Sequence, residues 1–569
     1  MKNKADTSNI ILRKICQRIN KINSKIEGVA GTKPEFVALI LLFVVHCLIT
    51  FFHEPCFDES HAWSIAKDGT IFQLLFEVPH YEGHPALWHL ILMPFAKSGI
   101  SMKAAFIIVT TFFYGINCWL ILFKAPFCRS LRLLLPFTYF FVYQYSVVAR
   151  PYCMLVTAII LLAILKENRD NKPGRYVAAM IFLCATSAFG VAISAGIAVE
   201  WVIQILKAYI KKQKSWRELV RDERIYLLIL LLVYALALLM RAMPKNSSGS
   251  ISFNADGKNS LFLQTIYLLL GLVSDGFVTN SYTDGYLKDF EFMIPELIGA
   301  CIIGALILGV ISYTAKKYGT LMAFIIPYIC YIFFSAKVYF CVYNSGIAVM
   351  IIVYWAWITV FECKNRENIK TVGEVECYKK DDKNSSSLRE KISIAGALMF
   401  VVPLFWGITS CVMDIFLVYA FGEKEGQFLN QEAYSNYNIC FDWSINSSGS
   451  QAKTLYDYGQ KHIMKNIQLR AFVDSNRILN WPFDYSMDLF YQAPETAEEH
   501  NEICNNLIAH GLPDILIGEV PVEQLTETDV KKNIFSDYTN VYTSHVDKIW
   551  KGNLTSAQTG IYIRNDLIK

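Results

Sequence analysis

The run FVALILLFVVHCLITFF, residues 36–52, decides the fold class of this chain of 569 residues, because it holds no charged side chain. A helix needs roughly 20 mostly apolar residues to cross the hydrocarbon core of a bilayer. Residues 1–34 are rich in Lys and Arg and have no apolar core or cleavage site of a signal peptide. Basic residues that flank a span mark its cytoplasmic side. We therefore expect the N-terminus in the cytoplasm and residues 36–52 to carry the chain outward.

The same two rules, applied along the whole chain, predict about 11 spans, with every loop rich in Lys and Arg on one side. The predicted spans are residues 36–52, 104–123, 133–149, 152–165, 176–189, 191–206, 225–240, 292–313, 321–334, 347–361 and 392–416. Two further apolar stretches, 86–96 and 261–273, are too short to cross or would reverse the topology. We expect them to form interfacial or re-entrant helices.

Composition agrees with a membrane protein, since 54% of the residues are hydrophobic. The formal net charge is only +4, and no basic stretch is interleaved with aromatic residues, which argues against nucleic acid as a partner. The 15 cysteines have no metal-ligand spacing. The expected fold is an α-helical polytopic membrane protein, multi-pass in the cell membrane, with a C-terminal extracytoplasmic α/β domain.

Three regions are expected. Residues 1–34 form a basic N-terminus that is cytoplasmic or lies on the membrane surface, and residues 35–421 form the transmembrane domain with an outer loop at 54–103. Residues 422–569 are polar and form the domain beyond the last span. Within it, helices are predicted at 451–463 and 495–510 and strands at 470–474 and 515–520. This alternation favours a small α/β domain, and no glycine-rich phosphate loop is present.

The outer loop is unusually polar for a segment held against a bilayer. Five of the 10 histidines lie between His53 and His89, together with several Asp and Glu residues. Charged groups near hydrocarbon cost free energy, so such a cluster has either water around it or a function. A hydrated loop without function is the simpler interpretation, and the pattern alone leaves it open.

Two segments of this loop, CFDESHAW at 56–63 and YEGHPALW at 81–88, resemble the first outer loop of the GT-C superfamily of membrane glycosyltransferases. They are most similar to the branch of the protein O-mannosyltransferases and aminoarabinose transferases. ARPY at 149–152 is similar to the Arg-x-Tyr that follows in many bacterial members. By motif the resemblance covers about residues 35–200 and implies a lipid-phosphate-linked sugar donor used on the outer face.

The residue types fit glycosyl transfer. A carboxylate must take the proton of the acceptor hydroxyl, an effect worth roughly 10²- to 10⁴-fold in rate, and Asp58 is the candidate base just beyond the first span. A cation near the departing lipid phosphate would stabilise its charge, and Arg150 keeps its charge at any relevant pH. Glu59 could orient an imidazole or help to hold a divalent cation, which remains a possible cofactor. The remaining candidates for substrate binding are His61, Tyr81, Glu82, His84, Tyr152 and Lys337.

One stretch departs from the family pattern. Where many relatives have an Arg or His pair near the outer face, this chain reads VYNSG at 342–346, so Lys337 or Arg241 would have to replace those cations. Each candidate also has a structural alternative. Asp58 could cap a helix, Arg150 could extend from a helix end to the head groups, and His84 could be a turn residue before Pro85.

The predicted function is thus transfer of a sugar from a polyprenyl-phosphate donor to a lipid, glycan or protein acceptor on the outer face, in contact with membrane lipids. A transporter or lipid flippase is the first alternative, for which charged residues inside the spans would mark a pathway. The middle parts of the predicted spans are nearly free of Asp, Glu, Lys and Arg. Glu200 and Asp414 are the exceptions, and the sequence assigns neither a role. A non-catalytic envelope assembly protein is the second alternative.

Overall fold

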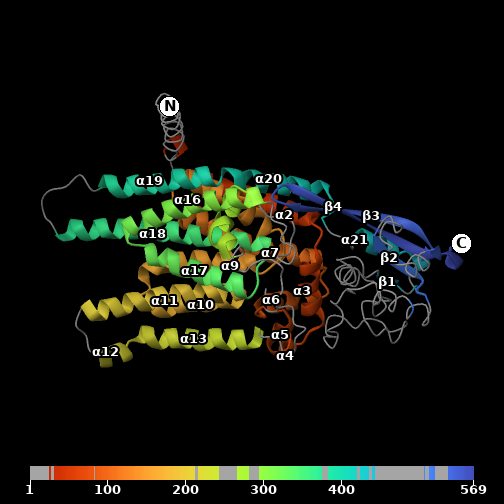
Figure 1. Ribbon diagram of the computed structural model, residues 1–569, viewed down its shortest axis with the longest axis horizontal. Helices are drawn as coiled ribbons and strands as arrows, with labels where there is room; N and C mark the ends of the chain where they lie inside the picture. The colour runs from red at the N-terminus through yellow and green to blue at the C-terminus, as the bar shows by residue number, and fades with distance from the viewer. Residues whose placement is uncertain are drawn as a thin grey trace.

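The computed structural model describes residues 25–26, 28, 31–82, 84–211, 216–242, 265–280, 294–373, 382–419, 423–434, 437, 439–441, 505, 512–519 and 536–568. Long helices lie side by side along the longest axis of the molecule (Figure 1). Short helices and a small β-sheet gather at one end of the bundle, on the right in Figure 1. This arrangement is the predicted one, a helical polytopic domain with a C-terminal sheet.

The long helices match most of the predicted spans. They are α2 (Lys33–Phe52), α7 (Met102–Lys124), α11 (Ala188–Lys211), α13 (Glu223–Ala242), α16 (Ile294–Tyr318), α17 (Leu321–Lys337), α18 (Ser345–Gly373), α19 (Asp382–Met399) and α20 (Val401–Phe416). Of the described helices, six are long and apolar enough to cross a membrane, or seven if the bent pair Leu388–Met399 and Val401–Phe416 is one span. The predicted spans 152–165, 176–189 and 321–334 correspond to α9 (Tyr152–Leu165), α10 (Pro173–Thr186) and α17, which have 14, 14 and 17 residues.

The predicted span 133–149 is not a regular helix. The chain passes through α8 (Arg129–Leu134), a 3₁₀ turn η1 (Leu135–Phe137) and a π-helical turn η2 (Phe140–Gln144). Proline at position 136 interrupts the helical hydrogen bonds. The freed groups find partners on other helices, since the Tyr114 hydroxyl donates to the Pro136 carbonyl at 2.9 Å. Irregular backbone at membrane depth is tolerated only where protein covers it, and the segment is indeed almost wholly buried.

Helices α11 and α17 approach each other closely because a glycine lies at their contact. A Cβ added to Gly196 would lie 2.5 Å from the Cα of Pro327. Small residues at such crossings let two helix backbones pack directly, which is the usual way in which helices associate in a membrane.

Buried ion pairs hold the end of the bundle opposite to the sheet. Glu200 accepts from Lys166 at 3.1 Å and from Arg169 at 2.8 Å, and Glu35 at the start of α2 pairs with Arg129 at 2.7 Å. These contacts account for Glu200, to which the sequence assigned no role. A buried charge with a hydrogen-bonded partner avoids most of the cost of its burial.

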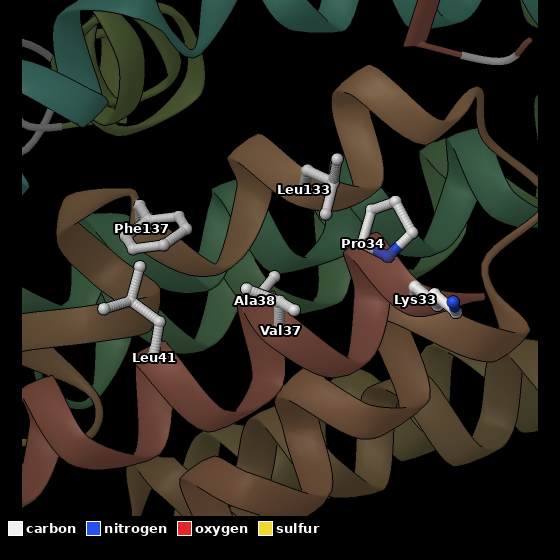
Figure 2. Close-up of a pocket in the computed structure, with 7 residues that line it drawn as sticks. All are labelled: Lys33, Pro34, Val37, Ala38, Leu41, Leu133 and Phe137. Atoms are coloured by element: carbon white, nitrogen blue, oxygen red, sulfur yellow. The ribbon is translucent and has the colours of Figure 1, made fainter. Parts of the chain in front are cut away.

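An apolar groove of about 510 Å³ runs along α2 at this opposite end. Figure 2 shows Lys33 and Pro34 at one end of the groove, and Leu41 and Phe137 at the other. Val37 on its wall is 65% exposed, as expected for a helix face that contacts lipid.

Four short helices form the outer loop: α3 (Phe57–Asp68), α4 (Ile71–Phe76), α5 (Pro79–Glu82) and α6 (Leu87–Lys97). The short helix predicted at 86–96 is therefore present as α6. Trp63 on α3 and Trp88 on α6 are 4% and 2% exposed and belong to one apolar core with α7. They fix the loop on the bundle from inside, whereas interfacial tryptophans would be exposed.

The C-terminal sheet has four strands, β1 (Ile439–Phe441), β2 (Ile515–Glu519), β3 (Tyr538–Trp550) and β4 (Asn553–Arg564), in the order β1-β2-β4-β3. Strand β1 is parallel to β2, and the other pairs are antiparallel. The predicted strand at 515–520 is thus confirmed as β2, and the long hairpin β3–β4 was not predicted. The elements predicted at 451–463, 470–474 and, apart from residue 505, 495–510 lie outside the described residues.

The turn of this hairpin is inserted into the helical domain. The Lys551 ammonium is buried and donates to the carbonyl of Asp275 and, at 3.2 Å, to that of Thr279. The Gly552 amide donates to Ser410 on α20 at 3.2 Å. Asp275 belongs to the short helix α15 (Leu272–Phe277), which begins at the end of the predicted re-entrant stretch 261–273. The sheet and the outer loop therefore lie at the same end of the bundle (Figure 1).

Candidate active site

A carboxylate and a guanidinium meet at the outer loop. Asp58 lies on the first turn of α3 with its side chain 38% exposed, and Arg150 lies just before α9 with its side chain 14% exposed. Arg150 Nη1 lies 3.5 Å from Asp58 Oδ2 and donates to the Asp58 carbonyl at 3.2 Å. Burial alone would lower the pKa of Arg150, but the neighbouring carboxylate raises it, so the guanidinium stays charged.

Glu59 is wholly enclosed by protein atoms and anchors three segments. Its carboxylate accepts from the amide of Cys56 at 2.8 Å, from the His53 Nε2 at 3.1 Å and from the amide of Ala149 at 2.6 Å. Burial would raise the pKa of Glu59, but the positive charge of His53 lowers it overall. The side chain that sequence reasoning placed beside Asp58 as a second catalytic group thus lies beneath Asp58, where it holds the backbone that carries Arg150.

Three further candidates, Tyr81, Glu82 and His84, lie in or just after α5, and a fourth, His61, lies on α3. His61 Nε2 is hydrogen-bonded to Glu82 Oε1. His84 is neutral at ordinary pH, because burial and then the charge of Arg150 lower its pKa to about 4. The backbone of Tyr81 lies in α5, and its side chain lies outside the described residues.

Tyr152 connects the site to the late segment that departs from the family pattern. Its hydroxyl donates to Asn344 Oδ1 at 2.8 Å, and its ring packs edge-on against Tyr343 at 5.9 Å between centroids. The Tyr339 and Tyr343 hydroxyls are hydrogen-bonded at 2.7 Å. The 3₁₀ turn η6 (Val342–Asn344) therefore contacts Tyr152, and the segment around it carries phenol hydroxyls where the family pattern has basic side chains.

The two cations proposed as substitutes lie elsewhere. Lys337 is exposed at the last turn of α17, and within the described part of the chain it makes no ion pair with Asp58. The Arg241 guanidinium lies 4.1 Å from the centroid of the Phe76 ring on α4. Arg241 therefore fastens α13 to the outer loop, and Arg150 is the cation closest to the candidate base.

Two functional residues were missed by sequence reasoning. His53 Nδ1 is hydrogen-bonded to Asp414 Oδ2 on α20 at 2.8 Å, and both side chains are buried. Burial would lower the pKa of His53, but the carboxylates of Asp414 and Glu59 raise it to about 10. The signal in the sequence was an acid inside the last apolar run, and only the fold shows which histidine it meets.

Several buried polar atoms around the outer loop have no hydrogen-bond partner in the described part of the chain. They are Ser60 Oγ, His84 Nδ1, Trp88 Nε1, His89 Nδ1 and Arg150 Nε. Such atoms are uncommon in native proteins, and each calls for a bound water, ion or ligand. They come from α3, from α6 and the segment before it, and from the segment before α9.

A metal centre receives no support from the geometry. Among the described residues, no three side chains of His, Cys, Asp or Glu are placed to hold a metal ion together. The carboxylate of Glu59, which could have been a second ligand beside Asp58, is already saturated by three donors.

Comparison with solved structures shows a likeness in fold. No family model matches the chain, and no curated protein matches it. A solved structure that it resembles is the crystal structure of ArnT from Cupriavidus metallidurans bound to undecaprenyl phosphate. The two chains are 11% identical over 95% of this chain and 100% of that chain, with a TM-score of 0.45. At this identity the likeness concerns the general arrangement of the chain, and a functional assignment depends on the side chains described above.

Proposed function

We propose that this protein is a membrane glycosyltransferase that moves a sugar from a polyprenyl-phosphate donor to an acceptor on the outer face of the membrane. The observation that carries the proposal is the Asp58–Arg150 pair, in which a half-exposed carboxylate lies 3.5 Å from a fixed cation. The pair lies where α2 ends and the outer loop begins, which in the predicted topology is the depth of the lipid head groups. A lipid-linked donor and an acceptor outside the bilayer can meet there.

The geometry supports a role for each of the two groups. As the acceptor oxygen forms its bond to the anomeric carbon, Asp58 takes the hydroxyl proton. The bond between the anomeric carbon and the phosphate oxygen breaks, and the polyprenyl phosphate leaves with the electron pair. Arg150 balances the charge that develops on this phosphate, and a guanidinium can do so with two parallel hydrogen bonds.

The unpartnered polar atoms support a sugar as the group between them. A hexose or pentose carries several hydroxyls, each of which can donate and accept. Neutral His84 and His89 can do both as well, and the Trp88 indole N–H can only donate. These groups are placed to satisfy sugar hydroxyls, and in return the sugar would satisfy buried atoms that otherwise cost free energy.

The late segment supports binding of the phosphate in a way that differs from the family pattern. The Tyr339 and Tyr343 hydroxyls form a pair, and burial raises the pKa of both. They therefore stay protonated. One hydroxyl donates to the other, so the pair has one O–H that can donate to a phosphate oxygen. Together with Arg150 they would replace the missing basic pair.

Charged residues inside the spans would favour a transporter, but here they are held in buried ion pairs. Glu200 is matched by Lys166 and Arg169, and Asp414 is matched by His53. Each acid inside the described helices that the sequence left unexplained thus has a structural partner. A transport pathway would need charged groups that change partners along it.

The test is chemical. Lipid and envelope glycan fractions from cells with and without the gene are compared by mass spectrometry, and the lost sugar identifies donor and acceptor. The purified protein in nanodiscs is then given that polyprenyl-phosphate sugar, and release of free polyprenyl phosphate is measured with acceptor present and absent. We expect release that depends on acceptor. Movement of intact donor across a liposome membrane without loss of its sugar would instead establish a flippase and refute the proposal.

A further inference from the structure

We infer that His53 and Asp414 are positioning residues which act through Glu59 to set the geometry between Asp58 and Arg150. This inference rests on the proposed function, which it deepens by extending the site to the last helix of the membrane domain. Neither residue touches the space where substrates would react.

The three side chains form one continuous hydrogen-bonded row. Asp414 Oδ2 lies 2.8 Å from His53 Nδ1, and His53 Nε2 lies 3.1 Å from Glu59 Oε2. Glu59 Oε1 accepts the amide of Ala149 at 2.6 Å. The side chains of His53, Glu59 and Asp414 are exposed by 2%, 0% and 0%, so water does not compete for these bonds.

The end of this row meets both parts of the site. Glu59 directly follows Asp58 in α3, and Ala149 directly precedes Arg150. One carboxylate therefore ties the backbone that carries the base to the backbone that carries the cation. A change in the position of Glu59 moves these two segments relative to each other, and a misplacement of about 1 Å at a reacting group can cost on the order of 10²-fold in rate.

Charge makes this arrangement depend on His53. Two buried carboxylates flank a single imidazole, and only the protonated ring can donate to both at once. Cys56 and Ala149 supply further N–H groups to Glu59, whereas Asp414 Oδ1 has no partner in the described part of the chain. Removal of the charge on Asp414 lets His53 become neutral, and a neutral ring can keep only one of the two contacts as a donor. A neutral ring can still donate from Nε2 to Glu59, but it no longer supplies the positive charge that lowers the pKa of Glu59.

The test compares Asp414→Asn and His53→Gln with Glu200→Gln. Glu200 is equally buried in an ion cluster at the opposite end of the bundle, so its variant reports the effect of a lost buried charge without a connection to the site. Activity is measured per folded molecule, with kcat and the donor KM determined separately. Hydrogen exchange of the peptide that contains Ala149 reports on positioning independently of catalysis.

We expect Asp414→Asn and His53→Gln to lower kcat by roughly 10- to 100-fold with a smaller change in KM, and to speed exchange at Ala149. Asp414→Glu should recover part of kcat, and Glu200→Gln should leave kcat and the exchange at Ala149 unchanged. If Asp414→Asn and His53→Gln both retain the wild-type kcat while the wild type transfers sugar, the inference fails and the proposed function stands. If the wild type transfers no sugar to any acceptor fraction, the proposed function itself fails and the inference fails with it.

Discussion

The Arg150 guanidinium contacts both the backbone carbonyl and the side-chain carboxylate of Asp58, although the two residues are 92 positions apart. The contact to the Asp58 carbonyl fixes the guanidinium on the first turn of α3, and the contact to the carboxylate leaves Asp58 partly exposed. The base is thus held at a fixed place and remains accessible to an acceptor. Two substitutions and one pH series test this interpretation of the site, and a third substitution tests how the C-terminal hairpin is held.

Asp58→Asn should lower sugar transfer by at least roughly 100-fold, because an amide cannot take the acceptor proton. The variant should still fold and insert, since Arg150 keeps its bond to the Asp58 carbonyl. Asp68→Asn on the exposed last turn of the same helix is the control and should retain activity. Release of polyprenyl phosphate by purified protein measures both variants, and unchanged release by Asp58→Asn would exclude Asp58 as the base.

Arg150→Lys should lower kcat/KM by roughly 10- to 100-fold, the loss expected when a hydrogen bond to a charged group is removed. The ammonium keeps the charge but cannot form the paired bonds of a guanidinium. Lys337→Gln tests the cation that the sequence suggested and should have little effect. The opposite order, with Lys337→Gln the more damaging change, would place the donor phosphate at the end of α17 instead.

The thermal stability of the protein should be highest near pH 6.5, which is the ordinary pKa of histidine. The pKa of His53 is raised to about 10, so its contribution is complete below pH 6.5 and is lost as the pH rises toward 10. The pKa of His84 is lowered to about 4, so its contribution is complete above pH 6.5 and is lost as the pH falls toward 4. Thermal unfolding in detergent between pH 4 and 10 measures both limbs.

Each limb of that profile can be assigned by a variant. The difference in Tm between the wild type and His53→Gln should shrink as the pH rises above 6.5, and the difference for His84→Gln should shrink as it falls below 6.5. A difference for His53→Gln that stayed constant across the alkaline range would mean that the imidazole is not protonated between its two carboxylates.

Gly552→Ala should loosen the C-terminal hairpin from the helical domain. Gly552 has a φ of 77°, and an added Cβ would lie 2.5 Å from Thr409 Oγ1. A backbone forced into this region costs about 1–3 kcal/mol. Limited proteolysis of the hairpin and the Tm measure the effect, and Gly174→Ala is the control because nothing lies within 4 Å of its added Cβ. Equal protease resistance in both variants would show that the turn adapts without strain.

Hydropathy predicted the course of the chain well wherever a span is a regular helix. Such a helix forms all its own backbone hydrogen bonds, so only the transfer free energy of its side chains decides whether it enters the bilayer. Hydropathy did not reveal the irregular backbone at 133–149, where the residues are apolar but Pro136 removes a helical hydrogen bond. The sequence pattern does not show that the Tyr114 hydroxyl donates to the Pro136 carbonyl, or that the Tyr145 hydroxyl of this segment donates to the Tyr343 carbonyl. The exact number of crossings depends on such segments.

The sequence motifs predicted those residues of the candidate site that lie close together in the sequence. Asp58, His61, Glu82 and His84 lie within one short loop, and its unusual polarity revealed them. The pairing of His53 with Asp414 spans 361 positions and has no local signature. Glu59 was predicted to orient an imidazole or help to hold a cation, and it is hydrogen-bonded to the His53 imidazole. Because a helix turns by about 100° per residue, its side chain points into the protein and away from that of Asp58.

The irregular passage through residues 135–149 also bears on biogenesis. Its hydrogen-bond partner Tyr343 and its packing partner Gly407 are synthesised long after it leaves the ribosome. Bare peptide groups do not partition into hydrocarbon, so this stretch cannot settle in the bilayer when it first emerges from the translocon. The nascent chain has to keep it sheltered until α18 and α20 arrive, and assembly of the bundle is therefore completed only at the end of translation.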